Sequence, residues 1–117
     1  MRTSPDGAIT IGVGGVTPTV WDQHSGARLG LLEGHSDLVG DGEFLDDRIF
    51  ISRAWNHTAL VWDVVSKRPL MTFRDVDQMR VAPDRSSVAL VGTKGVRVWS
   101  PHMPVPFLDA LPVLPSQ

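Results

Sequence analysis

The sequence predicts an all-β protein built from repeated four-stranded antiparallel sheets. Three of its four tryptophans end similar short apolar runs, at positions 21, 62 and 99, and are spaced 41 and 37 residues apart. That spacing is close to the period of about 40 to 45 residues typical of four-stranded repeat units. No window shows a sustained apolar period of 3.6 residues, so we expect almost no helix.

A turn signal repeats in phase with the tryptophans. Asp6, Asp47 and Asp84 each stand 15 residues before the tryptophan of their unit. In the first and third units a proline precedes the aspartate. Proline presets φ for the first turn position, and aspartate suits the next one. The sequence therefore predicts a hairpin turn at the same place in every unit.

Short alternating strands bounded by turn residues fill the segments between these markers. The middle unit has predicted strands at residues 39–44, 49–52, 59–62 and 69–73. The first unit has predicted strands at 8–12, 17–21 and 28–32, and it is expected to lack an opening strand because the chain starts at the turn that should follow one.

The third unit has predicted strands at 77–81, 87–91 and 96–99, with a fourth near 105–108. Pro104 and Pro106 would confine that last strand to a sheet edge, since proline has no N–H for a central ladder. We expect the units to span 1–33, 34–73 and 74–108, followed by a proline-rich tail at 109–117.

Composition narrows the class of protein. The 117 residues are 42% hydrophobic and 21% charged, with a formal net charge of −2, which is typical of a globular domain. Nothing in this charge balance indicates binding to nucleic acid or to an anionic membrane. There is no cysteine, no apolar segment long enough to span a membrane, and no signal-peptide core at the amino end. We expect a soluble, cytoplasmic protein without disulfides.

The repeated markers resemble those of the WD-repeat family of β-propellers. The match is carried mainly by the middle unit, in Gly34-His35, Phe44, Ser52, Asn56, Thr58 and Val61-Trp62-Asp63. The resemblance implies that each unit is a propeller blade. Propellers have roughly 4 to 8 blades, so three blades form an open, partial ring. The chain therefore resembles the carboxyl-terminal part of a longer propeller.

The resemblance also implies a buried hydrogen-bonded tetrad. In the family it joins a His before the first strand, a Ser on the second, an Asp in the next turn and the Trp on the third. The matching positions here are His35, Ser52, Asn56 and Trp62. Burial of a tryptophan removes on the order of 200 Å² from water, or about 5 kcal/mol, and its indole N–H then requires a partner. Asn56 replaces the usual Asp, so we expect a weaker network.

Other markers divide between core and surface. We expect Trp21, Trp99 and Phe44 to form the repeat core. Trp55 has no counterpart in the other units, and the family resemblance places it on the rim where partners bind. Exposed Trp and Arg are typical anchors of protein interfaces. The candidate rim comprises Trp55, Arg53, Gly40 and Asp41; the alternative is that Trp55 packs on a neighbouring unit.

We find no catalytic, metal or cofactor site in the sequence. His24, His35, His57 and His102 lack the close spacing of zinc ligands. The glycines at 12, 14 and 15 invite a phosphate-loop reading, but no helix is predicted to follow them. Acidic pairs such as Asp46-Asp47 lie in turns, where carboxylates remain solvated.

These observations favour a non-catalytic interaction scaffold that binds a protein or peptide. One alternative is a sensor or regulatory fragment of a larger signalling protein or enzyme whose active part lies elsewhere. Another is a decayed remnant, suggested by Gly42 at a position that usually carries a core apolar residue. An open set of blades exposes an apolar face at each end, so we also expect self-association, marginal stability or completion by another chain.

Overall fold

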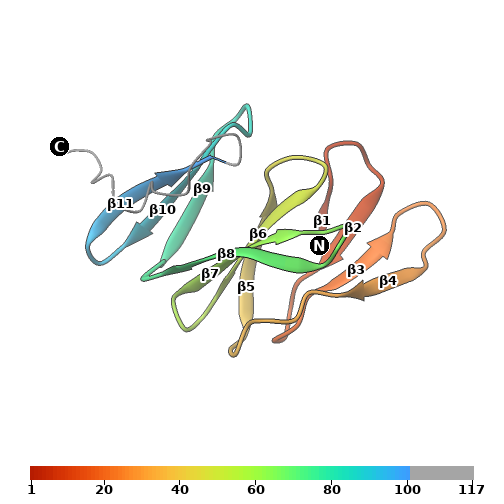
Figure 1. Cartoon of the computed structure of the whole chain (residues 1–117), viewed down its shortest axis with the longest axis horizontal. Coiled ribbons are helices and arrows are strands. Elements are labelled where there is room, and N and C mark those ends of the chain that lie inside the picture. Colours follow the sequence, from red (N-terminus) through yellow and green to blue (C-terminus); the bar gives the residue numbers. More distant parts are fainter. Residues whose placement is uncertain (101–117) are drawn as a thin grey trace.

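The computed structural model describes residues 1–100, and all regular structure in that range is β (Figure 1). The first sheet contains β1 (Arg2–Thr3), β2 (Ile9–Gly12), β3 (Thr19–Asp22) and β4 (Arg28–Leu31). The second contains β5 (Val39–Phe44), β6 (Ile49–Ala54), β7 (Thr58–Asp63) and β8 (Arg68–Arg74). The third contains β9 (Gln78–Val81), β10 (Val88–Gly92) and β11 (Gly95–Trp99).

Within each sheet, every strand pairs antiparallel with the strand next to it along the chain, so each sheet is a simple meander. This confirms the predicted all-β class for the described residues. Within residues 1–100, none of the three sheets closes on itself. Residues 1–100 contain no helix long and apolar enough to cross a membrane.

Two hydrophobic clusters join the three sheets, with the second sheet between the other two (Figure 1). Successive side chains of a strand point to opposite faces. In the second sheet Phe50 and Trp62 accordingly pack with the first sheet, while Ile51 and Val61 pack with the third. The second sheet is therefore buried on both faces, which explains why β7 is an almost continuous apolar run.

The three predicted turns are present, and they meet at one end of the sheets. The Gly7 N–H donates to the Ser4 carbonyl at 2.9 Å, and the Arg85 N–H donates to the Ala82 carbonyl at 2.8 Å. The first turn reaches the second through the Asp6 N–H, which donates to Asp47 Oδ1 at 2.9 Å. A hollow of about 330 Å³ lies among the turns, lined by Pro5, Leu45, Asp46, Asp47, Asp84, Arg85 and Ser86.

The first sheet differs from expectation in having an opening strand. β1 pairs with β2 through Arg2↔Ile11 and Thr3↔Thr10. Two residues are enough here because they lie directly before the turn and find the free edge of β2. Arg2 also forms a 3.1 Å ion pair with Glu43 of the second sheet. The third sheet has three strands within the described residues, and the fourth strand and tail expected beyond them lie outside that range.

Gly42 has a packing role in the second sheet. A Cβ added at Gly42 would lie 2.3 Å from Cζ of Phe50, on the neighbouring strand. The Phe50 ring fills that space and packs edge-on against Phe44, with ring centroids 5.0 Å apart. The glycine is thus matched to a large aromatic neighbour, which removes the support that it lent to the decayed-remnant interpretation.

We predict that Gly42→Ala destabilises the chain by about 1–3 kcal/mol, because the new methyl group overpacks against Phe50. The measurement is the urea unfolding midpoint. Gly12→Ala is the matched control, since a Cβ at that strand position meets only Trp21 Nε1 at an ordinary 3.8 Å. Equal stability of the two variants would contradict the packing role of Gly42.

Candidate interaction surface

A buried hydrogen-bonded network lies behind the candidate rim. Trp62 is fully buried, and its indole N–H donates to Ser52 Oγ at 2.8 Å. The same Ser52 oxygen lies 2.6 Å from His35 Nε2. The hydroxyl of β6 thus satisfies the indole of β7 and holds the loop that carries His35. This arrangement is structural, since all three groups are buried away from solvent.

Asn56 does not belong to this network, so its expected place in the tetrad is corrected. Its side chain is exposed, and Nδ2 donates instead to Ser36 Oγ at 3.1 Å. His35 Nδ1 is buried without a hydrogen-bond partner among the described residues. An amide whose oxygen carries no charge gains little from turning inward to His35, whereas the donor to Ser36 keeps it at the surface.

Burial lowers the pKa of His35 below its ordinary value near 6.5. The imidazole is therefore neutral at pH 7. A neutral ring suits a site in which only Nε2 has a partner, because a protonated ring would bury a charge beside an unsatisfied donor.

Gly34 makes room for the network. A Cβ at this position would lie 3.0 Å from Trp62 Cη2 and 3.1 Å from Leu60 Cδ1. The backbone before His35 therefore passes directly over the buried indole. This close approach gives a physical reason for a glycine immediately before the histidine.

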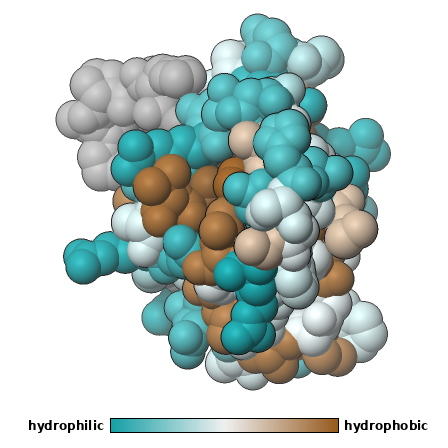
Figure 2. All heavy atoms as spheres, turned by 90° about the vertical axis from the view of Figure 1, so that its right-hand side faces the viewer, coloured by the Kyte–Doolittle hydropathy of each residue, from teal (hydrophilic) through white to brown (hydrophobic). Residues whose placement is uncertain are grey.

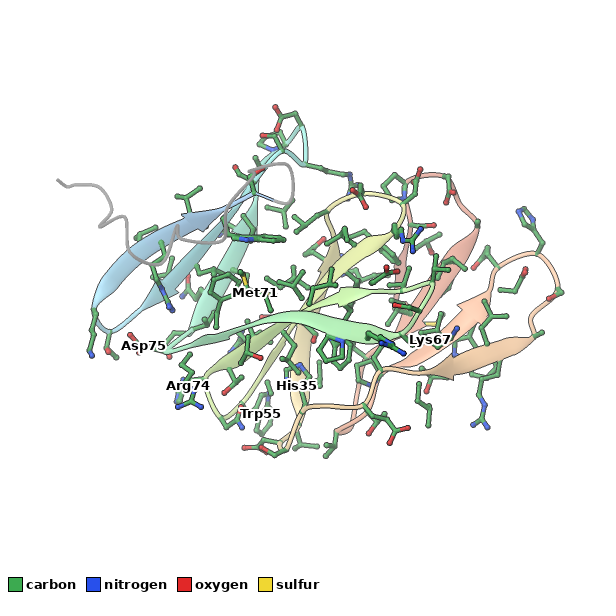
Figure 3. The ribbon with its side chains drawn as sticks, in the orientation of Figure 1. His35, Trp55, Lys67, Met71, Arg74 and Asp75 are labelled. Atoms are coloured by element: carbon green, nitrogen blue, oxygen red, sulfur yellow. The ribbon has the colours of Figure 1, made fainter. Side chains whose placement is uncertain are left out.

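Trp55 is exposed, with 63% of its surface accessible, and does not pack in the core. Figure 3 shows it at the lower end of the second sheet, beyond His35. The indole lies against Gly40: a Cβ there would be 2.8 Å from Nε1 and 3.1 Å from Cδ1. Within residues 1–100 the Trp55 indole N–H has no hydrogen-bond partner. One side of the indole therefore rests on the Gly40 backbone, and the rest of the ring is exposed to solvent.

An ion pair borders Trp55. Arg53 donates to Asp41 Oδ2 from Nη2 at 2.7 Å and from Nε at 3.0 Å. The two residues are cross-strand partners in β5 and β6. Both bonds reach Oδ2, and Asp41 is about half exposed, so Oδ1 remains available. The structure therefore brings all four predicted rim residues, Gly40, Asp41, Arg53 and Trp55, together on one surface.

Leu38 extends this surface and was missed in the sequence. Its side chain is 41% exposed, and its carbonyl accepts the backbone N–H of Trp55 at 2.8 Å. An isolated leucine before a strand gives no signal in sequence because strand ends commonly carry apolar residues. We define the rim surface as Leu38, Gly40, Asp41, Arg53 and Trp55.

The turn between the second and third strands of a sheet is tied back to the preceding loop in two different ways. In the second sheet Asn56 and Ser36 form the tie. In the third, the carboxylate of Asp75, labelled in Figure 3, accepts the Thr93 N–H at 3.1 Å and its hydroxyl at 2.9 Å. Hydrogen bonds from Thr93 hold the pKa of Asp75 below its usual range. Asp75 thus has a structural role in the third sheet.

Of the three residues expected in the repeat core, two are buried and one is exposed. Phe44 and Trp99 are buried, and Trp99 packs edge-on with Phe73 at a centroid distance of 6.1 Å. Trp21 is 36% exposed, which corrects its assignment to the core. The reason is positional, because no sheet within residues 1–100 packs against the Trp21 side of the first sheet.

The remaining polar candidates act as turn or surface groups. Asp46 Oδ1 accepts the backbone N–H groups of Arg48 and Ile49 at 2.8 and 2.7 Å. His57 forms an exposed 2.5 Å contact with Asp77. Residues 1–100 contain no group of three or more His, Asp or Glu side chains arranged to hold a metal ion; His102 lies outside that range.

Comparison with known proteins returns no matching family model and no similar curated protein.

We predict that acidification weakens the fold through His35. Its pKa is depressed in the folded state, so the unfolded state binds more protons below about pH 6.5 and stability falls as the pH drops through that range. The measurement is the urea unfolding midpoint at pH 7.5 and pH 5.5. His35→Gln should reduce the difference between the two, whereas His24→Gln, at an exposed turn, should preserve it. An unchanged difference in His35→Gln would refute the assignment.

Proposed function

We propose that this chain is a non-catalytic interaction module of the WD-repeat type, which binds a protein or peptide through the rim surface. The observation that carries the proposal is the exposed indole of Trp55, seated on the bare backbone of Gly40 beside the Arg53–Asp41 ion pair. A large aromatic group with an apolar body and a free N–H is a typical interface anchor.

The chemistry of the rim surface suits an extended segment with an apolar side chain. Trp55 and Leu38 offer an apolar seat, and both are well exposed. The indole N–H is available as a donor to a peptide carbonyl, and Oδ1 of Asp41 is available as an acceptor for a peptide N–H. An apolar anchor with a few oriented polar groups gives both affinity and register.

The backbone beneath this surface is ordered by pairing rather than left as a free loop. β5 pairs with β6 through Val39↔Ala54 and Asp41↔Arg53, and the Val39 N–H donates to the Gly15 carbonyl at 2.8 Å. The backbone N–H of Trp55 donates to the Leu38 carbonyl. A pre-ordered surface loses less conformational entropy on binding, which favours recognition.

The WD-repeat type is part of the proposal, and three features support it. The tryptophans and the hairpin turns recur with one offset, each unit is an antiparallel meander, and Trp62, Ser52 and His35 form a buried hydrogen-bonded chain. The meanders contribute only structure to the function; the rim surface supplies the binding groups.

The test is to pan a displayed library of random peptides against the folded chain and to measure the affinity of the enriched peptides by calorimetry. Trp55→Ala should weaken binding by about 30-fold or more, the effect of losing an anchor worth about 2 kcal/mol. Val65→Ala is the matched control, because Val65 is 61% exposed but lies in the turn after β7, at the opposite end of that strand. Enrichment that survives Trp55→Ala would refute the rim surface as the binding site.

Folding of these variants separates the surface from the core. Trp55→Ala should unfold at nearly the same temperature as the parent chain, since its side chain is solvated. Trp62→Ala should lose about 3–5 kcal/mol, because it leaves a cavity and removes the indole hydrogen bond to Ser52, whose Oγ keeps only its contact with His35. Circular dichroism during heating measures both, and equal destabilisation would contradict the separation.

A further inference from the structure

The three repeat tryptophans occupy one strand position but differ in exposure. Each ends or nearly ends the third strand of its sheet. Trp62 is fully buried against the first sheet, and Trp99 is 8% exposed against the second. Trp21 is 36% exposed. In every sheet with a predecessor, the tryptophan side is covered by that predecessor.

The valine before each tryptophan differs in exposure in the opposite sense, since it is exposed in the third sheet rather than in the first. Val20 and Val61 are fully buried, because the following sheet covers them. Val98 holds the same position in the third sheet and is 47% exposed. Neighbouring residues of a strand point to opposite faces, so the valine side is opposite the tryptophan side.

The first and third sheets thus leave two different faces open. We call the open side of the first sheet the tryptophan face, with Trp21, Leu29 and Leu31 exposed on it. We call the open side of the third sheet the valine face, with Val96 and Val98 exposed on it. Figure 2 looks at the molecule from the side of the first sheet and shows hydrophobic residues gathered there.

Both contacts inside the chain are of one kind, a valine side against a tryptophan side. In the first contact Val20 of the first sheet joins Trp62 of the second in one cluster; in the second contact Val61 joins Trp99. The two open faces are therefore the two halves of a third contact of the same kind. They lie on the outer sides of the first and third sheets, so one chain does not bring them together.

We propose that the tryptophan face of one copy packs on the valine face of a second copy, so that two chains join head to tail. Each contact joins two different faces, and two copies related by a two-fold axis make this contact twice, so that all four open faces are covered. The two internal contacts show that the position-matched apolar sides of these sheets fit each other. This inference is independent of the rim surface, which lies at the ends of strands and not on either open face.

The first measurement is the mass of the full chain by light scattering after size exclusion, at tens of micromolar. The expected value is twice the 12.8 kDa of one chain. A single species of one-chain mass, with the β signature in circular dichroism, would overturn the proposal.

The decisive measurement is a mixing experiment with Trp21→Glu and Val98→Lys. Each variant alone should be a monomer, because both contacts of the pair would then include one face that carries a charged substitution. An equimolar mixture should form a dimer again, since one of its two contacts then joins two native faces and the other pairs Glu with Lys. A monomeric mixture would overturn the proposal.

Two further outcomes distinguish other arrangements. If Val98→Lys alone remains a dimer, the tryptophan faces bind each other or the dimer uses another surface, and the proposal fails. Val96→Lys and Leu31→Glu, at more exposed or equally exposed positions, replace any variant that does not fold. Trp55→Ala should remain a dimer, so that loss of peptide binding and loss of pairing are separate results.

Discussion

The structure depends on burying the second sheet on both of its faces. A strand sends alternate side chains to opposite sides, so β7 supplies Trp62 to one cluster and Val61 to the other from adjacent positions. Each outer sheet is held mainly by this sheet between them. Its two-sided burial is what makes three short meanders, each too small for a core of its own, into one folded unit.

Burial of Trp62 imposes a polar requirement that shapes the neighbouring loops. Its indole N–H needs an acceptor, and Ser52 supplies one while also contacting His35. The loop before β5 is thereby drawn over the indole, and glycine at position 34 avoids a tight contact between a Cβ and the Trp62 ring. The same strand that presents Ser52 inward carries Arg53 outward, next to Asp41, and runs on to Trp55. The rim surface is thus supported by the buried network through one strand.

Much of the fold could be predicted from local pattern, because strand alternation and turn chemistry act over a few residues. The three hairpin turns and most strands lie where the spacing of tryptophan and aspartate indicates. The failures are of another kind. Asn56 matched a motif position, but its amide bonds Ser36. β1 is too short to give an alternating pattern, and only its pairing with β2 reveals it. Gly42 reads as a lost core residue until Phe50 is seen to fill its space.

By itself the sequence determined the all-β class, the repeat length and the residues able to form a buried tryptophan network, since all of these follow from period, propensity and hydrogen-bonding capacity. Only the tertiary structure decided which members of a repeated position are core and which are surface. Trp21, Trp62 and Trp99 look equivalent in the chain, yet their exposure differs because it depends on whether another sheet lies against them. Trp55 was likewise ambiguous until the backbone of Gly40 was seen to support it at the surface. Burial is a property of neighbours distant in sequence, which a local pattern does not contain.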